Sequence, residues 1–389
     1  IEFLRDVFSR YRLPIVVSYS GGKDSLVAVD LVAATGYKFS LLFNDTGLEA
    51  PETYENVKAV AELYGAELIV ASAGDRFWHA IREFGPPARD YRWCCKVIKL
   101  APITKAIEER YPQGVISVVG QRASESFQRA RLGRISPSRW VARAVVVAPI
   151  QDWSALEVWG YILLRGLPYN KAYERGFDRL GCVVCPANEL AEFELVKQYY
   201  KDIYEKLNNE ILSFYKYEKY IKYGLWRWKR QIPGDLSRYI KAAAAAEYPA
   251  EVDVHGTHVE LRGVSPDRET ALRLLKMLGR VHVEDGGAVV VAGRGGVVKL
   301  SSDLLHIEGD RALDAAALVM RSSICGLCDL CVSWCPTKAL ARDPSGKFRV
   351  DEERCTGCLL CSRACPSAQY LVYRIARTGR GPVQMRREE

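Results

Sequence analysis

Apolar runs alternate with helix-type periodicity over the first third of the chain. The runs 14–19, 39–43, 67–71 and 114–119 are rich in apolar residues, as buried strands are, and 24–34 and 56–64 show helical spacing. Strands that alternate with helices predict a parallel sheet with helices on both faces. Ligands of such sheets bind at the carboxyl ends of the strands, where this chain places glycines and acidic residues.

The pattern changes beyond residue 187. Residues 187 to about 245 lose the strand signal and favour helices, closing with the alanine run 242–246. Residues 251–320 alternate again, which predicts strands at 252–255, 281–283 and 288–292 and helices at 267–278 and 310–320. This part is therefore expected to form a small α+β module.

These segments predict four domains along the 389 residues, more than one core usually serves. Residues 1–190 are expected to form a nucleotide-binding α/β domain built on a doubly wound parallel sheet. A helical region follows at 191–248, then the α+β module at 249–320. A cysteine-rich α+β domain at 321–389 closes the chain and ends in an arginine-rich tail, 374–387.

Composition narrows the classes of function. Hydrophobic residues make up 49% and charged residues 26% of the chain, as in folded globular proteins, and no apolar run approaches the roughly 18 to 20 residues of a membrane helix. The chain begins Ile1-Glu2-Phe3 without a secretory signal or initiator methionine, a start compatible with a fragment. Metal-type cysteine spacings then predict a protein of the reducing cytoplasm without a membrane partner. The net charge of +8 permits an anionic substrate or nucleic acid without requiring either.

The histidines show no metal-ligand spacing except the pair His255-x2-His258. Because side chains alternate along a strand, this pair is expected to face opposite ways. We therefore interpret all five histidines as structural: His79, His255, His258, His282 and His306.

Residues 197–241 combine basic and aromatic side chains. This stretch carries eleven Lys/Arg against five Asp/Glu. Basic charge with stacking side chains suits RNA, and tRNA is one expected partner. An ordinary helical layer with inward aromatics and solvated lysines explains the same pattern. We prefer that reading because no RNA-binding module is recognisable.

Two identical cysteine runs lie in the last domain. Each has the form C-x2-C-x2-C-x3-C-P: Cys325, Cys328, Cys331, Cys335 with Pro336, and Cys355, Cys358, Cys361, Cys365 with Pro366. Iron–sulfur cubanes need four thiolates on short turns, and zinc sites rarely use two such runs. With the strand-like Phe348-Arg349-Val350 between the runs, residues 321–375 resemble a bacterial-type ferredoxin domain.

This resemblance implies two [4Fe-4S] clusters, each transferring one electron at low potential. In such domains the fourth cysteine of each run ligates the other cluster. One cluster would then take Cys325, Cys328, Cys331 and Cys365, and the other Cys355, Cys358, Cys361 and Cys335. An electron-donor protein or a ferredoxin is the expected partner.

A glycine loop, Ser20-Gly21-Gly22-Lys23-Asp24-Ser25, follows the first predicted strand and opens a helix. Backbone N–H groups of a glycine turn at a helix N-terminus bind phosphate, Lys23 adds a positive charge, and the serines add hydroxyl donors. The loop is not a Walker A motif, which has four residues between its glycines. It resembles the pyrophosphate loop of adenine-nucleotide alpha-hydrolases. A simple turn beside a helix is the alternative.

Further motifs follow in a fixed order. They are Asn44-Asp45-Thr46-Gly47, Pro51-Glu52-Thr53, Trp93-Cys94-Cys95-Lys96, Gly120-Gln121-Arg122, Glu125-Ser126, Arg129, Pro149 to Trp153, Leu167 to Asn170 and Gly181 to Cys185. This series resembles the phosphoadenylyl-sulfate (PAPS) reductase family over residues 14–186.

The family resemblance implies a bound adenine nucleotide: PAPS, adenylyl sulfate (APS) or ATP, with or without Mg²⁺. Its expected contacts are Ser20, Gly21, Gly22, Lys23, Asp24, Ser25, Asp45, Thr46, Gly47 and Gly120. Lys23, Asp24, Arg122 and Arg129 are the expected catalytic residues. The sulfate or phosphate end of the nucleotide would face Arg122, Arg129 and Arg131. A solvated charge cluster is the alternative, and for Arg131 the two interpretations are equally favoured.

The four other cysteines form a CC pair and a distant CxxC: Cys94, Cys95, Cys182 and Cys185. This spacing resembles the ligand set of cluster-bearing APS reductases. Both members of a CC pair reach one centre only from a helix or turn, since neighbouring side chains diverge on a strand. A third [4Fe-4S] cluster is expected here, with Lys96 offsetting its charge. Zinc, or a structural CxxC unrelated to the CC pair, are the alternatives.

Two features depart from the thiol-dependent members of the family. Those members carry a cysteine near the C-terminus that takes the sulfonate, whereas the twelve cysteines here fill three groups of four. Electrons are therefore expected from the fused ferredoxin segment. The loop with Lys23 is also intact, as in ATP-cleaving relatives such as the ATP sulfurylase small subunit and tRNA thiolation enzymes.

Three functions are consistent with these patterns. The first is an iron–sulfur oxidoreductase of sulfur metabolism that reduces an adenylyl sulfate bound at the glycine loop. The second is an ATP-dependent, adenylating sulfur transferase that acts on tRNA or a small molecule. The third is a nucleotide-gated electron-transfer subunit.

Overall fold

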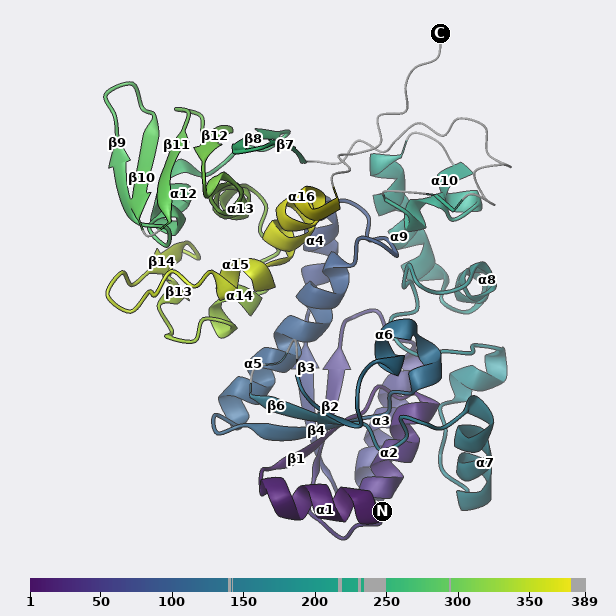
Figure 1. Ribbon diagram of the computed structural model, residues 1–389. Helices are drawn as coiled ribbons and strands as arrows, with labels where there is room; N and C mark the ends of the chain where they lie inside the picture. The colour runs from purple at the N-terminus through teal and green to yellow at the C-terminus, as the bar shows by residue number, and fades with distance from the viewer. Residues whose placement is uncertain are drawn as a thin grey trace. The chain divides into compact units, whose positions relative to one another are not determined.

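The computed structural model describes residues 1–138, 141, 143–215, 219–229, 232–233, 250–293 and 295–378 (Figure 1). The chain forms two compact units. The first comprises Ile1–Asp75 and Ile98–Leu207, and the second Arg76–Val97 and Asn208–Glu389. Segment 76–97 lies in the second unit although the predicted domain 1–190 includes it, and the domain boundaries stay a prediction. The predicted helix end at 242–246 and most of the arginine-rich tail fall outside the described residues.

The first unit is built on a six-stranded sheet with strand order β3-β2-β1-β4-β6-β5. All neighbouring strands are parallel except β5, which pairs with β6 in antiparallel fashion. The strands are β1 (Ile15–Ser18), β2 (Ser40–Asp45), β3 (Glu67–Ser72), β4 (Val115–Val119), β5 (Ile135–Pro137) and β6 (Ala144–Val147). The predicted doubly wound parallel sheet is confirmed. The sequence patterns did not reveal two of its strands, the parallel strand β6 and the edge strand β5.

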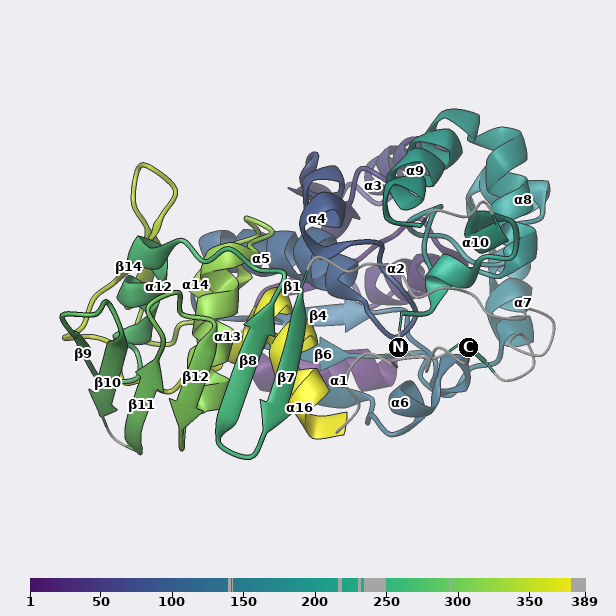
Figure 2. The same ribbon diagram turned by 90° about the horizontal axis from the view of Figure 1, so that it is seen from above.

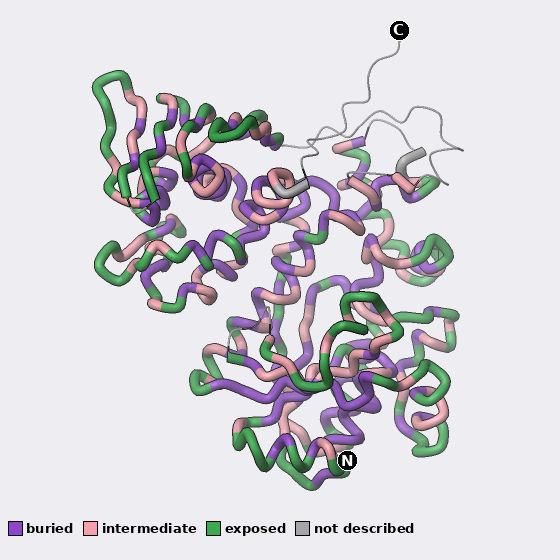
Figure 3. Tube along the Cα trace, in the orientation of Figure 1, coloured by how far each residue is buried: buried purple, intermediate pink, exposed green. Residues whose placement is uncertain are grey.

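Helices cover both faces of this sheet. The helices packed on the sheet are α1 (Glu2–Tyr11), α2 (Lys23–Ala33), α3 (Pro51–Leu63), α5 (Ala101–Arg110) and α7 (Ala155–Arg165). The unit also contains α6 (Phe127–Ala130), α8 (Leu190–Tyr199) and the short turns η2 (Ala123–Glu125) and η3 (Lys171–Arg175). Val17 packs into a core with α1, α2, α3 and α7, whereas the neighbouring Val16 packs with Ile107 of α5 on the other face. Alternation along a strand explains why consecutive valines serve two cores. The central strands β1, β2 and β4 are mostly buried (Figure 3).

The strand order reverses between β1 and β4, which lie side by side with Val17 opposite Val118. In open α/β sheets such a switch point leaves a crevice at the carboxyl ends of the strands, where ligands bind. The glycine loop follows β1 and Gly120 follows β4. Both predicted nucleotide-binding segments therefore lie at the switch point.

The second unit contains an antiparallel sheet with strand order β7-β8-β12-β11-β10-β9 (Figure 2). Its strands are β7 (Glu251–His255), β8 (His258–Arg262), β9 (Arg280–Val283), β10 (Val289–Gly293), β11 (Gly296–Leu300) and β12 (His306–Gly309). Helix α13 (Ala312–Ser323) contacts β8, β11 and β12, and α12 (Arg268–Leu275) packs on α13. The predicted α+β module is thus a sheet with helices on one face.

The remaining elements of the second unit are short. They are α4 (Arg76–Phe84), α10 (Lys219–Lys222), η4 (Leu225–Arg227), α14 (Leu330–Ser333), the hairpin β13 (Leu340–Arg342) and β14 (Phe348–Val350), α15 (Leu360–Ala364), the π-helical turn η5 (Ala368–Tyr373) and α16 (Arg374–Thr378). Two further elements cross the boundary between the units: the π-helical turn η1 (Cys95–Leu100) and α9 (Lys201–Phe214). No helix within the described ranges is both long and apolar enough to cross a membrane.

The expectation that His255 and His258 face opposite ways is wrong. They lie on two different strands, β7 and β8, joined by the two-residue turn Gly256-Thr257, and are direct cross-strand partners. Gly256 takes a positive φ of 62°, which such tight turns require. The two side chains therefore share a face of the sheet. Among the described residues no three His, Cys, Asp or Glu side chains converge on a single metal ion, so this pair stays interpreted as structural.

Candidate nucleotide site and cysteine centres

The glycine loop connects β1 to the first turn of α2. Gly21 has φ of +75°, and a Cβ there would lie 2.8 Å from Cγ2 of Thr53, so the position requires glycine. Gly22 caps α2 without a side chain of its own. Ser25 Oγ donates to the carbonyl of Gly22 (2.9 Å) and lies 3.3 Å from Ser20 Oγ. The loop thus presents backbone N–H groups at a helix N-terminus, the arrangement that binds phosphate.

Lys23 and Arg122 meet at the carboxylate of Asp24. Lys23 is only 5% exposed, and its Nζ lies 3.7 Å from Asp24 and donates to the carbonyl of Asp178 (3.0 Å). The buried Arg122 donates from Nε to the other oxygen of Asp24 (2.5 Å) and from Nη1 to Ser124 Oγ (3.0 Å). Asp24 therefore holds two cations beside the loop, where a phosphate would compete for the same charges.

Tyr173 is part of this loop although no sequence pattern pointed to it. Its hydroxyl accepts a hydrogen bond from the backbone N–H of Lys23 (2.8 Å), and its ring lies 5.4 Å from Lys23 Nζ. Burial raises the pKa of Tyr173, so the group is a neutral phenol whose own proton is available for donation.

Gly120 is required by packing. A Cβ at this position would lie 2.4 Å from the backbone C and O of Asp24 and 2.5 Å from the N of Ser25. The end of β4 therefore touches the first turn of α2, a contact that any side chain would block. A direct contact of Gly120 with a nucleotide stays a prediction.

Arg129 and Arg131 have different surroundings. Arg129 forms an ion pair with Glu125. Although burial acts to raise the pKa of Glu125, it lies below its usual value because the N–H of Arg122 donates to the carboxylate and Arg129 is close. Arg131 is exposed and stacks 4.1 Å from the ring centre of Phe127, which is itself 72% exposed. Of the three predicted arginines, Arg122 is the one that reaches the loop carboxylate.

The carboxyl end of β2 forms a second polar edge. Asp45 accepts hydrogen bonds from Tyr54 (2.7 Å), Ser72 (3.0 Å) and the N–H of Gly47 (3.0 Å). Thr46 donates from its N–H (3.0 Å) and its hydroxyl (2.6 Å) to Glu49, whose pKa is raised by burial. These bonds hold the predicted Asp45-Thr46-Gly47 turn in one conformation.

Cys182 lies against this turn. Its Sγ is 3.3 Å from Thr46 Oγ1, and the N–H of the next residue, Val183, donates to the carbonyl of Leu48 (2.8 Å). The N–H of Cys185 donates to the carbonyl of Cys182 (3.1 Å), which closes the CxxC turn. Burial raises the pKa of Cys182 to about 11, so it is a poor nucleophile at neutral pH unless a cation binds the sulfur.

The CC pair lies in the second unit, whereas Cys182 and Cys185 lie in the first. Cys95 opens the π-helical turn η1, in agreement with the expectation that a helix or turn carries the pair. The preceding Trp93 is fully buried, stacks on Phe77 and Phe84, and donates to the carbonyl of Gly85 (3.0 Å). This packing anchors the chain immediately before the pair.

The two ferredoxin-type runs share unusual backbone positions. Leu327 and Asp329 in the first run, and Gly357 and Leu359 thirty residues later, all have φ between 48° and 66°. Three of these four residues are not glycine, and such conformations in non-glycine residues are held by the surrounding structure. The repeat in sequence is thus a repeat in backbone geometry.

The neighbours of these thiols divide seven of the eight into two sets, and Cys355 joins the second set by the predicted ligand pattern. Burial and then the neighbours Cys365 and Cys325 raise the pKa of Cys328 to about 12. Burial also raises the pKa of Cys361, and Cys335 and Cys358 add to the effect. We call Cys325, Cys328, Cys331 and Cys365 the first group, and Cys335, Cys355, Cys358 and Cys361 the second group. The fourth cysteine of each run thus neighbours cysteines of the other run.

Cations lie against both groups. Arg321 is 1% exposed, its Nη1 lies 3.9 Å from Cys361 Sγ, and its Nε and Nη2 have no hydrogen-bond partner among the described residues. Arg342 Nη2 lies 3.2 Å from Cys325 Sγ. A buried guanidinium facing thiols suits thiolates that carry the negative charge of a bound centre. The donor sets and their cations therefore fit two cubane clusters.

Lys96 lies with the first group. Its Nζ donates to the carbonyl of Ala364 (2.7 Å), the residue before Cys365. Burial lowers the pKa of Lys96 to about 8, while Cys365 and Cys328 act in the opposite direction. The sequence analysis expected Lys96 to offset the charge of a centre at the CC pair, and the structure adds a contact that sequence spacing could not show.

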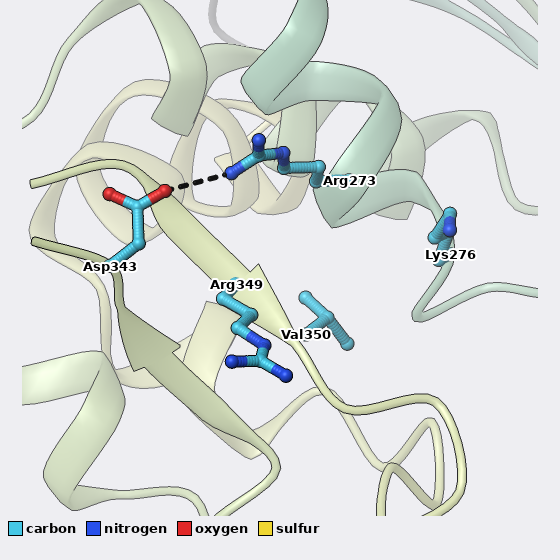
Figure 4. Close-up of a pocket in the computed structure, with 5 residues that line it drawn as sticks. All are labelled: Arg273, Lys276, Asp343, Arg349 and Val350. Carbon is cyan, nitrogen blue, oxygen red and sulfur yellow. Dashed lines mark hydrogen bonds and ion pairs between the residues drawn. The ribbon is translucent and has the colours of Figure 1, made fainter. Parts of the chain in front are cut away.

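A cavity of about 320 Å³ in the second unit is lined by Arg273, Lys276, Asp343, Arg349 and Val350 (Figure 4). Arg273 pairs with Asp343 (3.1 Å) and Glu269 (2.6 Å), and Lys276 pairs with Glu352 (2.6 Å). Most of its positive charge is therefore neutralised. The cavity shares no residue with the cysteine groups or the glycine loop.

Comparisons with known proteins match two parts of the chain. Residues 14–188 match the family model of the phosphoadenosine phosphosulfate reductase domain, and residues 324–368 match that of the 4Fe-4S dicluster domain. The uncharacterized protein MJ0066 of Methanocaldococcus jannaschii is 43% identical over 236 residues, 59% of this chain and 49% of that protein. The adenosine 5'-phosphosulfate reductase of Geobacillus kaustophilus is 29% identical over 200 residues, 48% of this chain and 79% of that protein.

The chain spans about half the length of the curated relatives that head the comparison, MJ0066 and MJ0973. Among solved structures, the PAPS reductase of Candida auris in its phosphate complex aligns over 46% of this chain and 87% of that chain, with 20% identity and a TM-score of 0.37. The two family matches thus assign residues 14–188 to a phosphoadenosine phosphosulfate reductase domain and residues 324–368 to a 4Fe-4S dicluster domain.

Proposed function

We propose that this protein is an iron–sulfur oxidoreductase that reduces the sulfur of an adenylyl sulfate nucleotide. The observation that carries the proposal is the 3.3 Å contact between Cys182 Sγ and Thr46 Oγ1. It puts the CxxC turn against a strand end at the edge of the sheet where nucleotides bind. A centre held there would be next to the sulfate end of the substrate.

In this proposal the glycine loop and the first turn of α2 bind the phosphate through backbone N–H groups. Lys23 and Arg122 release the carboxylate of Asp24, bind the phosphate oxygens of the substrate in its place and neutralise their charge. Thr46, held by Glu49, orients the sulfate end toward Cys182. These groups bind and orient the substrate, and they do not exchange electrons.

The chemistry is a two-electron step. The S–O bond to the nucleotide phosphate breaks, the phosphate keeps the bridging oxygen, and sulfur passes from the sulfate to the sulfite level. The bound clusters would supply the two electrons one at a time. Twelve cysteines in three sets of four leave no thiol for a thiosulfonate intermediate. The third set, Cys94, Cys95, Cys182 and Cys185, is proposed as a cubane site, with zinc as the alternative.

A second function is favoured by Lys23. An intact, buried lysine in the glycine loop suits ATP, whose cleavage between the α- and β-phosphates would adenylate an acceptor such as tRNA or a small molecule. The same loop would then activate the acceptor for sulfur transfer. Both nucleotides would use the same phosphate contacts at this loop.

The two functions differ in their products. Anaerobically purified protein is given APS, PAPS or ATP with a low-potential reductant, and sulfite and pyrophosphate are measured. The reductase proposal expects sulfite from APS or PAPS in an amount equal to the nucleotide released, and no pyrophosphate from ATP. Release of pyrophosphate without sulfite would contradict the reductase proposal and support the sulfur transferase function.

Lys23→Met is expected to weaken nucleotide binding by about 10- to 100-fold, because it removes one charged hydrogen-bond donor worth roughly 1.5–3 kcal/mol. Methionine keeps the length of the buried stem. Isothermal titration with APS and with ATP measures the loss. Lys105→Met, on the exposed surface of α5, is the matched control and should leave the affinity unchanged. Equal affinity of both variants would remove Lys23 from the site.

A further inference from the structure

The second unit packs the first-group cysteines against the segment that carries the CC pair. A Cβ on Gly326, between Cys325 and Cys328, would lie 3.0 Å from the ring of Phe84 and 3.2 Å from Cγ2 of Val97. These two residues flank Cys94 and Cys95 in sequence. The first turn of the ferredoxin segment therefore lies directly on segment 76–97.

The last helical turn of the ferredoxin segment makes a second contact with the same segment. The ring of Tyr370 in η5 packs edge-on against Tyr91, with 5.7 Å between ring centres. Burial raises the pKa of Tyr370 to about 12, and Cys95 and Cys94 contribute to the rise although Arg374 opposes it. Tyr91, three residues before Cys94, thus packs on η5, whose Gln369 N–H donates to the carbonyl of Cys365 (2.9 Å).

Lys96 connects the CC pair with the first-group cysteines. It directly follows Cys95, is only 2% exposed, and its ammonium donates to the carbonyl of Ala364 (2.7 Å) beside Cys365. A positive charge held in a buried site beside a cluster stabilises the reduced cluster, because reduction adds one negative charge. Arg342 makes a similar contact at Cys325 but is paired with Asp329, which offsets part of its charge.

The second group is placed differently. It contains Cys358, the one exposed cysteine of the twelve, and the acidic run Asp351-Glu352-Glu353 lies just before Cys355. An external donor reaches an exposed ligand most easily, and the first group has no exposed cysteine: Cys331 and Cys365 are buried and Cys325 and Cys328 are half-buried. The two groups therefore suit different ends of an electron path.

We propose that Lys96 tunes the reduction potential of the first-group cluster, and that electrons leave the ferredoxin segment from this cluster toward Cys94 and Cys95. Electrons from a donor enter at the second group and pass one at a time to the first. The inference rests on the clusters of the proposed function, but it does not depend on which nucleotide reacts.

Lys96→Met tests the tuning. In an anaerobic redox titration followed by EPR, it should lower the midpoint of one ferredoxin cluster by at least the ~59 mV that corresponds to a tenfold change for a one-electron couple. Arg342→Gln, which removes the donor to Cys325, should shift the same signal. Lys347→Met, an equal charge change on the β13–β14 hairpin where the neighbours are Glu269 and Asp267, should shift neither.

Several results would overturn the assignment. Unchanged midpoint potentials in Lys96→Met protein with full iron content would show that Lys96 does not tune a cluster. If Lys96→Met shifts one EPR signal and Arg342→Gln shifts another, Lys96 acts on the second-group cluster instead. In the wild type, the signal that responds to Arg342→Gln should broaden when a Cys94–Cys95 centre is also reduced, and no broadening would refute the exit route. All measurements are made without nucleotide, so failure of the proposed reaction does not affect them.

Discussion

Cys182→Ala is expected to reduce sulfite formation by more than about 100-fold, beyond the 10- to 100-fold typical of losing an outer-shell partner of a metal ligand. The sulfur lies 3.3 Å from Thr46 at the end of β2, so its loss removes the proposed centre where the sulfate would be. The variant should still show both ferredoxin clusters by EPR, since Cys182 lies outside the unit that contains the first and second groups.

Iron analysis of the same variant tests the third centre independently of turnover. Three cubanes predict about twelve irons per chain for the wild type and about eight for Cys182→Ala. About eight irons with one zinc in the wild type would assign zinc to this set instead. Thr46→Val is the companion variant: it removes the hydroxyl beside the sulfur and should lower the rate while leaving the iron content intact. Full turnover in Cys182→Ala would contradict the role given to this residue.

Gly120→Ala is expected to destabilise the first unit by about 3 kcal/mol, the upper part of the usual range for overpacking. The added Cβ would lie 2.4 Å from backbone atoms of Asp24, and backbone cannot rotate away as a side chain can. Thermal unfolding followed by circular dichroism measures the loss. Nucleotide binding should fall as well, since the first turn of α2 must move.

Gly160→Ala provides the control for this substitution. Gly160 lies inside α7, and nothing lies within 4 Å of the position that its Cβ would take. Alanine is favoured over glycine in a helix by roughly 0.5–1 kcal/mol, so this variant should be as stable as the wild type or slightly more so. Equal melting temperatures for both variants would show that β4 and α2 can separate at little cost.

Much of the fold followed from local patterns. Strands β1 to β4 of the parallel sheet and the helices of the α+β module were predicted because hydrophobic periodicity is a property of neighbouring residues. The parallel strand β6 was not predicted. Strand β5 was missed because three residues with a terminal proline carry too little pattern. The β7–β8 turn was missed although Gly256-Thr257 between two alternating runs is a hairpin signal. That error reversed the relative orientation of His255 and His258.

The candidate site likewise contains residues that local motifs predicted and residues that only the structure revealed. The glycine loop, the Asp45-Thr46-Gly47 turn and the cysteine runs have spacings that chemistry requires, so they could be identified from sequence. Tyr173, Glu49 and the carbonyl of Asp178 join the site from segments without a motif. Arg131 illustrates the opposite case, since its position in sequence suggested the site and its side chain stacks on Phe127 instead.

The sequence by itself determined which ligands are present and at what spacing, because a turn of four cysteines or a glycine loop is built from consecutive residues. Only the tertiary structure decided which charges surround them. Arg342 reaches Cys325 from 17 residues away and Arg321 reaches Cys361 from 40 residues away. Lys96 reaches the carbonyl of Ala364, beside Cys365, from 268 residues away. Such contacts depend on how buried surfaces pack, and packing is not encoded in any local spacing.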